Sequence, residues 1–179
     1  GGRTADHVFL GEPADVVEEE AQTLRGEGLD IRGQSRPDQR VDHARLASPT
    51  HAVDVLRPAV EMIRDLPFAG TGYLWPDADG ITSNLVLLAT TAAAELAGHA
   101  LSIGDIDLVF WATGQGLKVI PGHEELIGLR MRAHARSGDL AGVRQEWESY
   151  ERVITSDAWS DGEPAPKLLD LRRELLTSP

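Results

Sequence analysis

Apolar residues recur at intervals of three and four along most of the chain after residue 48, which is the spacing of amphipathic helices. The clearest run has an unbroken three-four-three-four spacing: Leu140, Val143, Trp147, Tyr150 and Ile154. Similar spacing predicts further helices from Ser48 to about Asp65, from Asp79 to Ile103, from Asp105 to about Leu117, around Leu126 to Ala133, and from Pro164 and Pro166 through Leu175. Only a short run at residues 7–10 alternates as a strand would, so the pattern predicts an all-α fold.

The dipeptide Gly-Asp occurs at Gly104 and again at Gly138, 34 residues later. Apolar residues after the two copies keep the same phase, as in the pairs Ile106 with Leu140, Val109 with Val143, and Ile120 with Ile154. A period of 34 residues is typical of tetratricopeptide helix pairs. In the first copy, Gly104 is expected to end one helix and Asp105 to cap the next. Residues 49–179 are therefore predicted to form a tetratricopeptide-like superhelix of antiparallel helix hairpins.

Three residues interrupt the expected helices. Pro58 lies inside the first, where a missing amide and a ring clash cost roughly 3 kcal/mol, so we expect a kink or a break there. Gly114 and Gly116 lie in a helical pattern that glycine disfavours. We therefore expect a neighbouring helix to cross closely at these two glycines.

Residues 1–48 form a predicted N-terminal extension, richer in charge and turn formers than the rest of the chain. One helix is predicted there, from Pro13 to Arg25. The acidic run Glu18 to Glu20 within it is read as a solvated helix face rather than a docking element. Because the chain begins Gly1-Gly2-Arg3, we expect it to be a piece of a larger protein.

The formal net charge of −12 argues against broad binding to nucleic acid or to anionic membranes. The absence of cysteine excludes disulfides and thiolate chemistry. The most apolar segment, Ile81 to Ile103, contains Asn84, Glu95 and His99, so it is predicted to be a buried helix rather than a membrane span.

Two motifs that suggest a ligand are each incomplete. Gly70-Thr-Gly72 and Gly114-Gln-Gly116 follow no strand and lack the Gly-Lys-Ser/Thr of a phosphate loop, so turns or close helix contacts are favoured. His123-Glu124 starts like a zinc-peptidase helix, but Ile127 stands where the second histidine ligand belongs. No catalytic residue, cofactor or metal site is predicted.

The best candidate binding site is a basic cluster in this acidic chain: Arg130, Arg132, Arg136 and Arg144. Arginine forks suit carboxylates, so the cluster would bind an acidic peptide or another domain. The favoured alternative is ion pairing with Glu124, Glu125, Glu146 or Glu148 of the same chain.

Aromatic residues supply further candidates. Tyr73 and Trp75, with Trp159, lie in predicted loops and are candidate surface anchors for a partner. Trp111, Trp147 and Tyr150 stand at inward helical positions, so a core role is favoured over a peptide groove.

From about Val41 onward, four segments share features with one helical module. These are residues 59–68 (AVEMIRDLPF) with Trp75, residues 121–124 (PGHE) with Arg130-Met131, residues 133–138 (AHARSG) with Trp147, and residues 162–166 (GEPAP) with Leu168 and Leu171. In this order they resemble the bacterial transcriptional activator domain, a tetratricopeptide-like module of actinobacterial regulators. Residues 67–81 and 111–127 look closest to copies of that domain in larger proteins with LysM or membrane segments.

The resemblance implies a non-enzymatic, cytoplasmic docking module of a larger bacterial regulatory protein, which binds another protein or an adjoining domain of its own chain. The alternative is a transcriptional-activator regulatory domain that acts with a separate DNA-binding domain. Residues 1–48 are too short for the winged-helix domain that precedes the module in activators, and they hold ten acidic against six basic residues. Direct nucleic acid binding is therefore not expected of this chain.

Overall fold

The computed structural model describes residues 39–42, 48–69, 80–156 and 162–177. The chain divides into two compact units, residues 1–39 and residues 40–179. The second unit reaches further toward the N-terminus than the predicted boundary at residue 48, because Val41 is buried in its core. The predicted helix at residues 13–25 and the short run at residues 7–10 lie outside the described residues.

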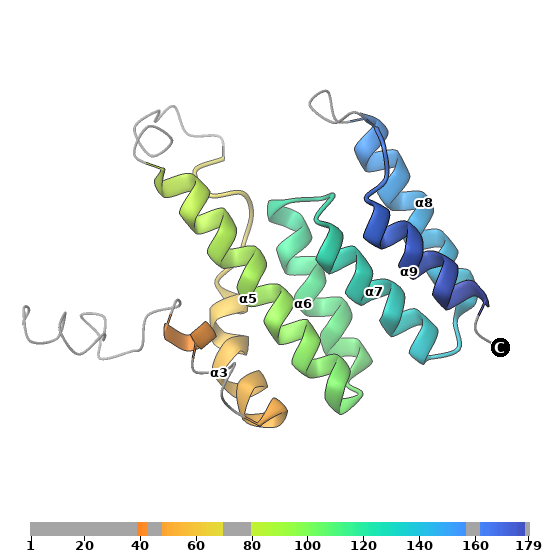
Figure 1. Ribbon diagram of the computed structural model, residues 1–179. Coiled ribbons are helices and arrows are strands. Elements are labelled where there is room, and N and C mark those ends of the chain that lie inside the picture. Colours follow the sequence, from red (N-terminus) through yellow and green to blue (C-terminus); the bar gives the residue numbers. More distant parts are fainter. Residues whose placement is uncertain (1–38, 43–47, 70–79, 157–161, 178–179) are drawn as a thin grey trace, which may run out of the picture. The chain divides into compact units, whose positions relative to one another are not determined.

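The second unit is all-α within the residues that the structure describes, which confirms the predicted class (Figure 1). Its main helices are α3 (Pro49–Glu61), α5 (Ile81–Ile103), α6 (Ile106–Val119), α7 (Glu124–Arg136), α8 (Leu140–Ser156) and α9 (Pro166–Thr177). Their order and approximate bounds follow the apolar spacing of the sequence.

The helices pack in two layers. Helix α7 packs against both α5 and α9, and these three lie side by side at the front of Figure 1. Helices α6 and α8 lie behind them, each antiparallel to the helix before it, and α3 packs against α5 and α6. The first helices of successive hairpins, α5 and α7, together with α9, therefore form one continuous face, called here the front face.

Both Gly-Asp turns have the same hydrogen bonds. Gly104 and Gly138 take φ values of 83° and 74°, a left-handed conformation that favours glycine. The Asp105 amide donates to the Ala100 carbonyl and the Asp139 amide to the His134 carbonyl, each over 2.9 Å, so each turn ends its helix in a Schellman arrangement. The two turns therefore account for the 34-residue period.

The aspartate of each turn then starts the next helix. Asp105 Oδ1 accepts from the Leu108 amide over 3.0 Å, and Asp139 Oδ1 accepts from the Gly142 amide over 2.8 Å. These side chains satisfy amides that a helix start leaves without a partner.

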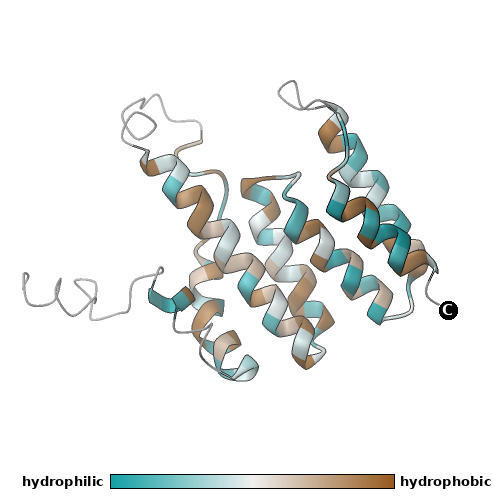
Figure 2. Cartoon of the chain, in the orientation of Figure 1, coloured by the Kyte–Doolittle hydropathy of each residue, from teal (hydrophilic) through white to brown (hydrophobic). Residues whose placement is uncertain are grey.

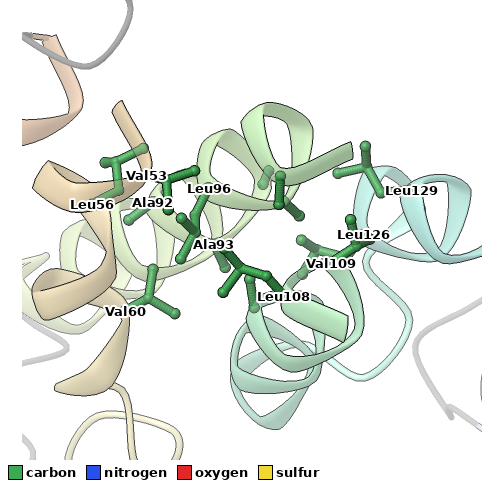
Figure 3. Close-up of a cluster of buried hydrophobic side chains, with 14 of the residues drawn as sticks. Val53, Leu56, Val60, Ala92, Ala93, Leu96, Leu108, Val109, Leu126 and Leu129 are labelled. Carbon is green, nitrogen blue, oxygen red and sulfur yellow. The ribbon is translucent and has the colours of Figure 1, made fainter. Parts of the chain in front are cut away.

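Buried apolar side chains form two clusters that meet at α7. The larger joins α3, α5, α6 and α7, and Figure 3 labels ten of its members: Val53, Leu56, Val60, Ala92, Ala93, Leu96, Leu108, Val109, Leu126 and Leu129. The smaller joins α7, α8 and α9: Ile127, Met131, Val143, Trp147, Tyr150, Leu168 and Leu171. Figure 2 shows the corresponding alternation of apolar and hydrophilic positions along α8 and α9.

Three local predictions need correction. Helix α3 continues through Pro58, so the predicted break does not occur there, and the helix ends at Glu61, before the predicted end near Asp65. Ser48 is its N-cap, but its side chain makes no capping hydrogen bond. The N-cap of α5 is Gly80, in a left-handed conformation, rather than Asp79.

The predicted close helix crossing is confirmed at Gly116 but not at Gly114. A Cβ atom on Gly116 would lie 2.6 Å from Leu126 Cδ1 and 2.9 Å from Ala93 Cβ, whereas one on Gly114 would meet nothing within 4 Å. Helices α5 and α7 thus approach α6 closely on the Gly116 side alone.

We predict opposite effects of alanine at these two glycines. Gly116→Ala should lower the free energy of unfolding by about 1 to 3 kcal/mol, because the methyl group collides with Ala93 and Leu126. Gly114→Ala should raise it by up to about 1 kcal/mol, because alanine favours the helix and its methyl group has room. Urea unfolding followed by circular dichroism tests both; equal effects would contradict the packing at Gly116.

Candidate functional site

Arg130 is held inside the protein by an ion pair. Its Nη2 atom lies 2.5 Å from Glu146 Oε1, and the two side chains are only 23% and 13% exposed. Its guanidinium also lies over the Phe110 ring, 5.0 Å from the centroid. The alternative given by the sequence, pairing with a glutamate of the same chain, therefore holds for Arg130.

His134 extends this pair into a network that joins α6, α7 and α8. Its Nδ1 atom lies 2.9 Å from Asp139 Oδ2 and its Nε2 atom 3.5 Å from Glu146 Oε1. The Phe110 ring packs against the imidazole at 4.6 Å. Phe110, Arg130, His134 and Glu146 line a hollow of about 610 Å³, bounded also by Ser149 and Tyr150 and called here the α6/α8 hollow.

Asp139 is the residue of this network with a clearly perturbed titration. The amide of Gly142 and the imidazole of His134 both donate to its carboxylate, so these hydrogen bonds lower the pKa of Asp139 below its ordinary value of 3.8. The same aspartate that starts α8 thus also fixes the orientation of His134.

The other three arginines of the predicted cluster lie apart from Arg130. Arg136 donates from Nη1 to the Leu101 carbonyl in the last turn of α5, so it links the two hairpins. Arg144 is exposed on α8, where its Nη1 atom donates to the Leu140 carbonyl over 3.4 Å. Arg132 is exposed beside α9. The structure does not gather the four guanidinium groups around one hollow.

The aromatic residues divide between core and surface. Trp147 and Tyr150 are 1% and 2% exposed, as the core interpretation predicted. The Tyr150 hydroxyl accepts from the Ala165 amide over 3.1 Å, which anchors the chain before α9. Trp111 is half-buried, with Arg57 over its ring. Tyr73, Trp75 and Trp159 lie outside the described residues, so their anchoring role stays a prediction.

The front face carries a hollow between α5 and α7 that sequence reasoning missed. This α5/α7 hollow has a volume of about 620 Å³. Helix α5 contributes Thr91, Ala94, Glu95, Gly98, His99 and Ser102, and the α7 side contributes His123, Glu125 and Leu129. The α5 residues recur at the three-or-four spacing of one helical stripe, which is the signal that would have found them.

Two histidines and two glutamates are among the residues that line the α5/α7 hollow. His99 Nε2 and His123 Nδ1 are buried without a hydrogen-bond partner among the described residues. His99 Nε2 lies 3.9 Å from Glu95 Oε2, and Glu125 is exposed at the start of α7. Neither lysine nor arginine lines this hollow in the described part of the chain.

A second hollow on the front face lies between α7 and α9. This α7/α9 hollow has a volume of about 430 Å³ and an apolar floor of Gly128, Leu168 and Leu171. Charged side chains surround the floor: Glu124, Glu125, Arg132 and Lys167. Glu125 lines both hollows, so the two adjoin on the front face.

Within the described residues, no group of three His, Cys, Asp or Glu side chains is placed to hold a metal ion. Helix α5 has the length and composition of a membrane span, a test that core helices also pass, and 39% of its most apolar window is buried here. We found no family model, curated protein or solved structure that matches the chain. Its function is therefore argued from the geometry.

Two glutamates on α8 provide a test of the buried pair. Glu146→Gln should lower the free energy of unfolding by about 1 to 3 kcal/mol, because it leaves the largely buried Arg130 without its carboxylate. Glu148→Gln, at an exposed position, should change it by less than about 0.5 kcal/mol. Equal losses of unfolding free energy in the two variants, measured by urea unfolding, would show that the ion pair with Arg130 does not stabilise the fold.

Asp139 should make the free energy of unfolding depend on pH. Because its pKa is lower in the folded than in the unfolded protein, its stabilisation is complete above pH 3.8 and is lost as the pH falls through the lowered value. Asp139→Ala should therefore unfold at lower urea than the wild type at pH 7, and the difference should shrink below pH 3.8. A difference that stays constant with pH would contradict this role.

Proposed function

We propose that the chain is a non-enzymatic, tetratricopeptide-like docking module, which binds a protein segment or an adjoining domain on its front face. The proposal is supported by the repeated Gly-Asp turns, 34 residues apart, and by the packing of α5, α7 and α9 in one layer. Helical repeats present such faces as binding surfaces.

The observation that carries the proposal is the pair of adjoining hollows on the front face. Arg132, Lys167 and Glu125 line them without an ion pair or hydrogen bond to any other described residue. Charged groups that the fold leaves without partners beside an apolar floor are suited to a partner that supplies the opposite charges.

The α6/α8 hollow is less suited to a function of its own. His134 directs both ring nitrogens at carboxylates, Asp139 and Glu146, so neither nitrogen is directed at a hydroxyl nucleophile such as Ser149. Arg130 neutralises Glu146 in the same place. We assign this network to holding α7 on α8.

Among the four predicted arginines, we propose Arg132 as the partner-binding one. It lies on the front face, whereas Arg130 and Arg136 are engaged within the fold and Arg144 lies on α8. From the sequence resemblance we further propose a cytoplasmic place in a larger bacterial regulatory protein, related to the bacterial transcriptional activator domain.

Site-specific photo-cross-linking in the source cells tests the docking face. The full-length protein would carry p-benzoylphenylalanine in place of Glu124 on the front face or of Glu148 on α8, two exposed glutamates. We expect cross-links to another protein or to another part of the same chain from the first position only. Cross-links from Glu148 alone, from both equally, or from neither would contradict the proposal.

Charge reversal within the same experiment tests Arg132. Arg132→Glu should reduce the cross-link from position 124 several-fold, because the α7/α9 hollow then lacks the guanidinium that would pair with the partner. Arg144→Glu is the matched control on α8 and should leave the cross-link unchanged. Equal loss in both variants would remove Arg132 from the docking site.

A further inference from the structure

We infer that the α7/α9 hollow binds an extended partner segment that contains a basic, an apolar and an acidic residue in close succession. This partner chemistry rests on the proposed docking function and makes it more specific. Two charges on α7, Glu125 and Arg132, and the apolar floor between them point to it.

Glu125 and Arg132 provide one charge of each sign on the same side of α7. They are seven residues apart, which is about two helical turns. Both are exposed and both line the hollow. Neither side chain makes an ion pair or hydrogen bond with another described residue. The fold therefore leaves both charges available to a partner.

The apolar floor lies between these two charges along α7. Gly128 is three residues after Glu125 and four before Arg132. A Cβ atom on Gly128 would lie 3.4 Å from Leu171 Cδ2 and 3.5 Å from Leu168 Cδ1. Because α7 has no side chain at this position, the two leucines of α9 can be reached from the hollow and can pack against an apolar side chain of the partner.

The guanidinium of Arg132 lies at the edge of this floor. Its Nη1 atom would be 3.7 Å from the same Cβ position on Gly128. A partner carboxylate paired with this guanidinium would thus lie beside the apolar side chain that packs on the floor. Arginine suits this role because its guanidinium can bind both oxygens of a carboxylate.

The distance between the two charges sets the spacing in the partner. Seven residues of α-helix rise about 10.5 Å, whereas an extended chain advances about 3.3 Å per residue. The residues that pair with Glu125 and Arg132 should therefore be about three or four positions apart, with the apolar residue between them. The direction in which the segment crosses α7 sets the order of its two charges.

The balance of charge around the floor disfavours other occupants. Glu124 and Glu125 are matched by Arg132 and Lys167, so the lining carries no net charge. A segment with one sign of charge would be attracted by Glu125 and repelled by Arg132, or the reverse. A purely apolar segment would remove water from these charged groups without pairing with them. A segment with both charges avoids both costs.

Selection from an unbiased library tests the inference. A phage-displayed library of random dodecapeptides would be panned against the 179-residue chain at physiological salt, and enriched peptides would be synthesised and measured by fluorescence polarisation. We expect the enriched peptides to share a basic, an apolar and an acidic residue at the stated spacing. No enrichment, or enrichment of peptides with one sign of charge or none, would overturn the inference.

Alanine in place of the apolar residue of a selected peptide tests the floor on the wild-type chain. It should weaken binding at least about fivefold, because the burial of a large apolar side chain is lost. Alanine at a peptide position outside the three residues is the control and should change affinity less than about twofold. Equal effects would contradict packing on Leu168 and Leu171.

Exchange of the two charges on α7 locates the binding site. Glu125→Lys/Arg132→Glu keeps the net charge but inverts both ends of the stripe, so it should weaken the selected peptides at least about tenfold. Peptides whose acidic and basic residues are exchanged should bind this variant better than the original peptides do. Arg144→Glu/Glu148→Lys makes the same exchange between exposed residues of α8 and should change affinity less than about twofold.

Circular dichroism melting would establish that each variant is folded. Equal weakening by the two exchanges, or no gain with the exchanged peptides, would overturn the inference. Cross-links from position 124 in cells without selection of such peptides would leave the docking function standing and reject this partner chemistry. Selected peptides that bind this hollow without front-face cross-links in cells would support the chemistry and contradict the docking function.

Discussion

Each helical hairpin depends on a two-residue Gly-Asp turn. The glycine adopts a left-handed conformation, which allows backbone amides of the turn to cap the C-terminus of the first helix. The aspartate carboxylate then caps the N-terminus of the second helix. The Gly138 and Asp139 amides donate to the Ala135 and His134 carbonyls of α7, and the Asp139 carboxylate accepts from the Gly142 amide of α8. The chain thus reverses direction without a long loop. The same turn occurs at Gly104, so α5 with α6 and α7 with α8 are joined in the same way, and α7 packs against α5.

Helix α7 contributes side chains to both buried clusters. Leu126 and Leu129 face the cluster shared with α5 and α6, while Ile127 and Met131 face the cluster shared with α8 and α9. Most of its circumference is therefore occupied by core packing. The surface of α7 that remains on the front face is mainly charged, so under the proposed docking function a partner would meet charged groups on α7 and apolar side chains on α9.

Sequence reasoning succeeded where structure is local. The spacing of apolar residues identified the helices, and Gly104 with Asp105 was sufficient to place a turn, because their hydrogen bonds involve near neighbours. It failed where residues from different hairpins meet. Arg136 reaches the Leu101 carbonyl, and His123 joins His99 in one hollow, only because the hairpins stack in a particular register. Pairwise spacing along one helix cannot report that register.

The charges of this chain illustrate why composition and sequence clusters mislead about binding. Arginines close together in sequence point in different directions around α7, so Arg130 and Arg136 are engaged within the fold. Glu95 and Glu125, which both line the α5/α7 hollow, are 30 residues apart in the sequence, so a short sequence pattern does not connect them. The fold therefore separates arginines that lie near one another in the sequence, and it places two glutamates that are distant in the sequence around one hollow. Under the proposed docking function, the charge that a partner must carry follows from this arrangement rather than from the net charge.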